Sequence, residues 1–156
     1  MPVDVTTRGL GRRSGISAKT VERQAEAMLA EVGRSAAYLS VVLCDDATIA
    51  ELNGVYRDRP EPTDVLSFGQ TGQPADGGET PRPPVPRSSR GEPELLGDVV
   101  ISIPFASRQA PDGLRSEVAR LLAHGLLHLL GWDHDTAPTR RAMIHEMDRL
   151  VRASRA

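Results

Sequence analysis

Residues 116–134, SEVARLLAHGLLHLLGWDH, decide how this 156-residue chain can fold. Their apolar side chains have the spacing of a helix that buries one broad face. These side chains are Val118, Leu121, Leu122, Leu126, Leu129 and Leu130. Gly131 ends the pattern, because glycine readily adopts the left-handed conformation that turns a chain out of a helix. The run is too short to cross a bilayer and contains two histidines, so we predict a core helix over 116–130.

Shorter patterns outside this helix predict alternating strands and helices. Runs of β-branched and apolar residues indicate strands at 3–7, 38–44, 63–68 and 96–103. Helices are indicated from Ser17 to Gly33, after Asp45 or Asp46, and from Pro138 to Val151. We therefore expect one α+β domain over 1–156, with helices packed on a small mixed β-sheet of about four strands, the last two of which pair.

Two of these helices have an apolar side that we expect to face inward. In the short helix it comprises Ile49, Leu52, Val55 and Tyr56. In the last helix it comprises Met143, Ile144, Met147, Leu150 and Val151. Segment 69–94 is rich in proline and glycine and has few apolar side chains, so we predict a mobile loop there.

Charge and cysteine content limit the classes of partner and compartment. Nineteen basic and twenty-one acidic residues leave a net charge of −2, so any contact with a polyanion or a membrane must be local, for example at Arg12-Arg13 or Arg140-Arg141. The single cysteine, Cys44, excludes an internal disulfide and suits a small buried apolar role in a reducing compartment. With no signal-like apolar stretch, we expect a cytoplasmic protein that does not engage the membrane.

Three histidines carry the chemistry that this sequence suggests. His124 and His128 stand one helical turn apart, which lets two imidazoles converge on one metal, and a turn at Gly131 can bring His134 back to it. This spacing is that of the metzincin zinc site. An isolated histidine in a core helix is more often a hydrogen-bonded core residue, but three at this spacing favour zinc. A closed structural site would need a fourth ligand, for which Cys44 and His145 are the only candidates and neither has motif spacing.

The residue after the first histidine bears on the reaction. Zinc proteases of the HExxH type place a glutamate there as general base, whereas this chain has Gly125. Peptide hydrolysis is therefore disfavoured, and hydrolysis of another electrophile such as a phosphodiester stays open. A phosphodiester substrate requires a cation to hold its anionic oxygens.

Four blocks of this sequence together resemble the YbeY family of bacterial endoribonucleases, which act in ribosomal RNA maturation. The first block is the histidine box HGLLHLLGWDH at 124–134. The others, in order along the chain, are LNGVYR at 52–57, PTDVLSF at 62–68 and LGDVVIS at 96–102. The chain differs from the family's usual pattern in having Trp132 where tyrosine is common and in the length of its Pro/Gly-rich loop.

The resemblance implies a function and a set of site residues. It implies that His124, His128 and His134 bind one Zn²⁺ per chain and that Arg57 is the catalytic or substrate-clamping cation. It also implies action on 16S rRNA and in quality control of the small ribosomal subunit, with that subunit and its assembly factors as partners. A guanidinium suits the role of Arg57, because its planar donors match phosphate oxygens and stay protonated. Taken alone, Arg57 would be an ordinary surface arginine at a helix end.

Two other functions remain open from the sequence: a zinc hydrolase acting on a peptide or small molecule, and a non-catalytic ribosome-assembly factor with a structural metal. Several polar residues near the motifs also have two interpretations. Thr63, Asp64 and Ser67 line a cleft or, slightly favoured, cap a strand. Asp133 and Asp135 orient the ligand imidazoles or belong to a solvated turn.

Overall fold

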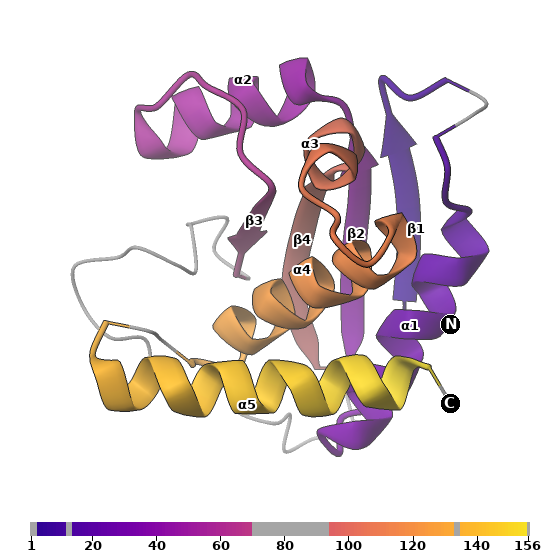
Figure 1. The fold of residues 1–156 in the computed structure, drawn as a ribbon, viewed down its shortest axis with the longest axis vertical. Coiled ribbons are helices and arrows are strands. Elements are labelled where there is room, and N and C mark those ends of the chain that lie inside the picture. The colour runs from indigo at the N-terminus through magenta and orange to yellow at the C-terminus, as the bar shows by residue number, and fades with distance from the viewer. Residues whose placement is uncertain (1–2, 12–13, 70–93, 133–134, 156) are drawn as a thin grey trace.

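A four-stranded sheet forms the centre of the computed structural model, which describes residues 3–11, 14–69, 94–132 and 135–155 (Figure 1). The strands are β1 (Val3–Arg8), β2 (Tyr38–Cys44), β3 (Val65–Phe68) and β4 (Leu95–Ser102). They lie in the order β1-β2-β4-β3, with β1, β2 and β4 parallel and β3 antiparallel to β4 at one edge. The mixed sheet, its size and the pairing of β3 with β4 confirm the predicted α+β class.

Five helices occupy the described residues. They are α1 (Ala18–Glu31), α2 (Asp46–Arg57), α3 (Ile103–Arg108), α4 (Leu114–Leu129) and α5 (Ala137–Ser154). Side chains cap the predicted starts: Ser17 accepts from the Thr20 amide at α1, and Asp45 from the Thr48 amide at α2. The sequence did not predict α3, because Pro104 was taken to end a strand; instead it lies in the first turn of a helix that Ser102 caps.

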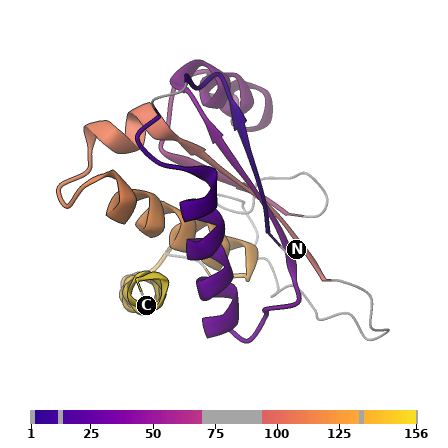
Figure 2. The same ribbon diagram turned by 90° about the vertical axis from the view of Figure 1, so that its right-hand side faces the viewer.

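The helices cover the two faces of the sheet unequally (Figure 2). α1, α3, α4 and α5 lie on one side, and the larger core forms between α1, α4 and inward side chains such as Leu39, Val41 and Ile101. α2 lies on the other side, over a small cluster of Cys44, Ile49, Leu66, Phe68 and Val100. Neighbouring residues of one strand join different clusters because strand side chains alternate between faces.

The prediction of which side chains of α2 and α5 face inward is partly wrong. Val55 is 72% exposed and Tyr56 is 47% exposed, so α2 buries only a narrow stripe that includes Ile49. Val55 is six residues from Ile49, or roughly two-thirds of a turn around the helix. Tyr56 does face the sheet, but at its edge, where its ring centroid lies 5.0 Å from that of Phe68. Ile144 of α5 is likewise 52% exposed.

Some expectations fall outside what the structure describes. Residues 70–93 are not described, so the mobile loop at 69–94 stays a prediction, as does the role of Arg12-Arg13. Within the described residues, no helix combines the length and apolar character that crossing a bilayer requires.

Candidate active site

His124 and His128 lie one turn apart on α4, and their imidazoles converge. Their Nε2 atoms are 2.9 Å apart, and their ring planes meet at 74°. The His128 side chain is buried, with the residue only 4% exposed, whereas His124 is half-buried at the surface of the helix. The structure therefore brings the first two predicted ligands together at a single point beside α4.

The backbone of Trp132 fixes the orientation of the His128 ring. His128 Nδ1 lies 3.0 Å from the Trp132 carbonyl oxygen. A carbonyl only accepts hydrogen bonds, so Nδ1 donates to it and Nε2 is the ring nitrogen turned toward His124. Metal-binding histidines usually donate their second ring N–H in this way, which fixes both the tautomer and the ring orientation. The His124 and His128 pair is thus chemically suited to hold a metal ion.

The turn after α4 has the predicted conformation. Gly131 has a φ of 97°, and its amide donates to the His128 carbonyl at 3.0 Å, while the Trp132 amide donates to the Leu127 carbonyl at 2.9 Å. These two bonds define a Schellman motif, which ends a helix and redirects the chain. His134 lies outside the described residues, so its place as third ligand stays a prediction. Within the described part of the chain, no group of three or more His, Cys, Asp or Glu side chains could hold a metal.

Gly125 lets α4 pack closely on the sheet. A Cβ atom at this position would lie 2.7 Å from Val99 Cγ1 and 3.0 Å from Ser67 Oγ. The Ser67 hydroxyl also donates to the Gly125 carbonyl at 3.2 Å, which fastens α4 to β3. The position where zinc proteases carry a glutamate therefore faces the sheet and has no room for a side chain.

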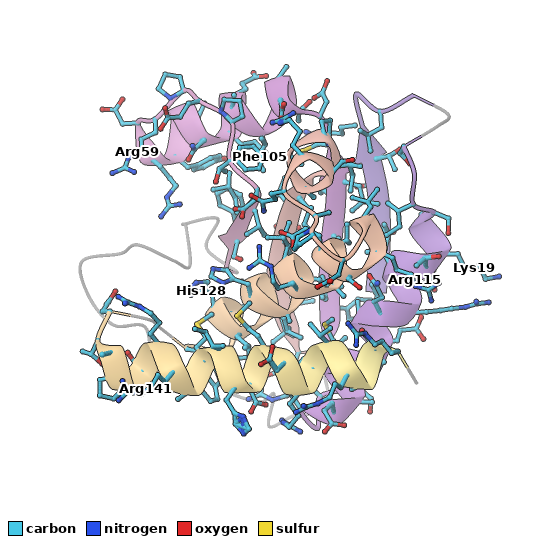
Figure 3. All side chains as sticks on the ribbon, viewed as in Figure 1. Lys19, Arg59, Phe105, Arg115, His128 and Arg141 are labelled. Carbon is cyan, nitrogen blue, oxygen red and sulfur yellow. The ribbon has the colours of Figure 1, made fainter. Side chains whose placement is uncertain are left out.

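Arg57 is the last residue of α2, and β3 connects this end of α2 to α4. Tyr56 packs on Phe68 from one face of β3, and Ser67 bonds to α4 from the other. Arg57 is half-buried, and Asp58 follows it in the left-handed conformation, which ends the helix. Figure 3 shows Arg59, just beyond α2, and His128 on the same side of the molecule. The edge strand β3 therefore contacts both the end of α2 that carries Arg57 and the helix that carries the histidines.

The structure also shows how α2 is fixed at this end, which the sequence analysis missed. Asn53 is buried, and its Nδ2 donates to the Glu61 carbonyl at 3.0 Å. The backbone carbonyl of Asn53 accepts from the Arg59 amide at 3.2 Å. A buried polar residue on the inward side of a short helix is the signal that could have identified this anchor.

Asp64 and Ser67 have structural bonds, in keeping with the favoured interpretation. Asp64 Oδ1 accepts from the Val65 amide at 2.8 Å, and Oδ2 accepts from Gln109 Nε2 at 3.1 Å. Gln109 Nε2 also donates to Glu117 Oε2 at 2.7 Å, so Gln109 bridges two carboxylates. No local sequence pattern predicts this bridge, because Asp64 lies 45 positions before Gln109. Thr63 contacts Asp64 at 3.5 Å, and Asp133 lies outside the described residues.

Arg120 completes this network on α4. It pairs with Glu117 through two hydrogen bonds, of 3.1 Å to Oε1 and 2.6 Å to Oε2. Burial opposes ionisation of Glu117, but the hydrogen bonds from Arg120 and Gln109 outweigh it and hold the pKa of this carboxyl below its usual value. Glu117 is therefore ionised, and both of its carboxylate oxygens accept hydrogen bonds. Its bond to Gln109 ties α4, which carries the histidines, to the segment after α3.

Cys44 and His145 do not join the histidine pair. Cys44 is buried on the α2 side of the sheet, and burial raises the pKa of its thiol to about 12. His145 is exposed on α5. Neither residue closes a four-ligand structural site with His124 and His128.

Comparison with known proteins identifies the family. A family model described as endoribonuclease YbeY matches residues 12–155. The chain is 46% identical over 121 residues to the endoribonuclease YbeY of Synechococcus sp. (strain RCC307), covering 76% of this chain and 69% of that protein. It is 44% identical over 129 residues to the endoribonuclease YbeY of Persephonella marina, covering 81% and 74% of the two chains.

A solved structure supports the fold independently. A solution structure from Thermotoga maritima matches with a TM-score of 0.58 over 96% of this chain and 88% of the other, at 22% sequence identity. That identity supports a common fold and nothing further. The converging imidazoles of α4, the four sequence blocks and the family match across most of the chain agree with one another. This chain therefore belongs to the endoribonuclease YbeY family.

Proposed function

We propose that this endoribonuclease cleaves ribosomal RNA at a single zinc ion held by His124, His128 and His134, and that Arg57 binds the scissile phosphate. The observation that carries the proposal is the convergence of two Nε2 atoms at 2.9 Å, with the lone pair of His128 directed by its bond to Trp132. Nitrogens this close can share one ion at Zn–N distances of ~2.0–2.1 Å. Zinc would supply Lewis-acid chemistry, polarising a phosphoryl oxygen and lowering the pKa of water.

The chain's own residues perform the remaining steps. The Nδ1–H bond of His128 to the Trp132 carbonyl holds the ring so that Nε2 can bind a metal without reorienting. The guanidinium of Arg57 offers paired donors to phosphate oxygens, so it stabilises the charge that develops there during cleavage. Ser67 and Gly125 fix α4, which carries the histidines, against β3.

Peptide hydrolysis is less well supported. The close packing of Gly125 on Val99 leaves no space for the glutamate that zinc proteases use as general base. The family match likewise favours an enzyme over a non-catalytic assembly factor with a structural metal. We further propose that residues 1–156 work as one domain in the cytoplasm, with the small ribosomal subunit and its assembly factors as partners.

The metal assignment is tested by elemental analysis of purified variants. His128→Ala should lose most of the bound zinc, because a ligand and its oriented lone pair are removed. His145→Ala is the matched control and should keep the wild-type zinc content, since His145 is exposed on α5. Equal zinc in wild type and His128→Ala would refute the ligand assignment.

The role of Arg57 is tested on labelled ribosomal RNA, with a peptide library in parallel. Arg57→Ala should keep zinc and fold but lose roughly a hundredfold or more in kcat, as when one transition-state donor is removed. Arg115→Ala is the control, because Figure 3 shows Arg115 on the side of the molecule away from His128. Wild-type cleavage by Arg57→Ala would remove Arg57 from the mechanism, provided that His128→Ala from the same purification leaves the RNA uncut.

A further inference from the structure

Trp132 is the only tryptophan of the chain, and it lies beside the histidines rather than in the core. Trp132 is 37% exposed, although an indole is the largest apolar side chain available to fill a core. In a Schellman motif the residue at this position commonly packs on the residue five before it, and Leu127 is fully buried. A contact of this kind requires only part of the indole and gives no reason for the exposed part.

The backbone of Trp132 is fixed relative to the site. Its amide donates to the Leu127 carbonyl at 2.9 Å, and its carbonyl accepts from His128 Nδ1 at 3.0 Å. The same peptide segment that orients the His128 imidazole therefore also carries the indole. The Cα atom from which the indole projects keeps a constant position relative to whatever His128 binds.

Resting on the proposed function, we propose that the indole of Trp132 stacks on a nucleobase of the RNA next to the cleaved phosphate. Exposed aromatic rings beside a backbone-binding site are how proteins hold single-stranded nucleic acids, because every base offers a flat face. The net charge of −2 gives the whole molecule no general attraction for RNA, so local contacts must supply the affinity. Trp132 is then a substrate-positioning residue, whereas Arg57 contacts the phosphate.

The tryptophan fluorescence of this protein comes from Trp132 alone, because the chain has no other tryptophan. The zinc-loaded protein is titrated with a 2′-O-methyl RNA oligonucleotide, whose integrity is checked on a gel, and with an abasic oligonucleotide of the same length. Both carry the phosphates, but only the first carries bases. Stacking predicts a change in emission with the first oligonucleotide and none with the second, whose binding is followed by an end label.

Three variants separate stacking from other roles of this position. Trp132→Ala should raise the KM for RNA about tenfold, since stacking on one base is worth one to two orders of magnitude in affinity, and should change kcat little. Its zinc content should be unchanged, because His128 contacts the backbone carbonyl that alanine retains. Trp132→Tyr should restore the KM. Tyr38→Ala, which removes an exposed aromatic at the start of β2, should behave as wild type.

Several results would overturn the proposal. One is equal emission change with the abasic oligonucleotide, and another is an unchanged KM in Trp132→Ala. Loss of zinc in Trp132→Ala would instead show that the side chain holds the site together. Unchanged RNA kinetics with weaker association to small-subunit particles would assign Trp132 to a protein contact. Failure of the proposed function looks different, because the wild-type protein itself would then leave ribosomal RNA uncut.

Discussion

Cys44 ends β2 with its side chain buried among apolar residues on the α2 side of the sheet. Its Sγ lies 3.6 Å from the Ile101 carbonyl oxygen, to which the thiol donates. Burial is the largest cause that raises its pKa to about 12, and the nearby carboxylates Asp45 and Asp46 act in the same direction. Only the thiolate is a nucleophile, so a thiol in this setting is inert. The small buried role predicted for Cys44 is confirmed.

Cys44 should therefore resist alkylation in the native protein. A rise in pKa from 9.0 to about 12 reduces the thiolate population about a thousandfold at pH 8, and burial hinders the reagent further. We expect iodoacetamide to label the denatured chain rapidly and the native chain only through unfolding, as followed by mass spectrometry. Since the chain has one cysteine, the denatured protein is its own control. Comparable labelling rates in both states would contradict this assignment.

Helix α4 and the strands β3 and β4 meet at Gly125. Val99 packs against the position that a Cβ atom would occupy. It is fully buried, and its β-branched side chain has little rotational freedom. Moving α4 away from β4 would expose side chains of the larger core. This contact sets the distance between α4, which carries the histidines, and β4, whose neighbour β3 bonds to α4 through Ser67.

Gly125→Ala should destabilise the protein despite the better helix propensity of alanine. Propensity favours the substitution by about 1 kcal/mol, whereas overpacking a filled core costs ~1–3 kcal/mol. We expect a net loss in the free energy of unfolding, measured by urea denaturation. The double variant Gly125→Ala with Val99→Ala should recover part of the loss attributed to the clash, as judged by a double-mutant cycle. Strict additivity of the two substitutions would show that the clash is not the cause.

A polar network links three segments of the molecule: the residue before β3, the end of α3 and the start of α4. Gln109, just after α3, bridges Asp64 before β3 and Glu117 on α4, and Arg120 pairs with Glu117. The Asp64 carbonyl also accepts from the Ser102 amide, where β4 passes into α3. Because these residues come from distant parts of the chain, the network forms only when the fold is complete.

This network should make stability depend on pH in the acid range. The pKa of Glu117 is lowered in the folded state, so its contribution is present above the ordinary carboxyl pKa and is lost as pH falls through the folded value. Between pH 7 and about pH 3.5, the wild type should therefore lose more unfolding free energy than Glu117→Gln, which cannot titrate. Glu51→Gln, at an exposed position on α2, should follow the wild type. Parallel pH profiles for wild type and Glu117→Gln would remove Glu117 as the source.

Sequence alone determined the elements whose pattern is local. The heptad-like leucines of α4, the left-handed turn at Gly131 and the caps at Ser17 and Asp45 all depend on residues within a few positions of one another. The four-strand mixed sheet and the family followed from the same local patterns. The ligand role of His134 and the mobility of the loop stay predictions, since these residues lie outside the described ones.

Tertiary structure decided what depends on distant partners. Pro104 was compatible with a strand end or a helix start, and packing of Ile103 and Ala106 into the core selected the helix α3. Val55 is apolar, yet α2 covers only a small cluster and leaves that residue in solvent. The tautomer of His128 was likewise set by a carbonyl whose position the turn fixes. In each case the free energy of the local conformation depends on which surfaces meet in the folded chain. Residues that are neighbours in the sequence do not determine which surfaces meet.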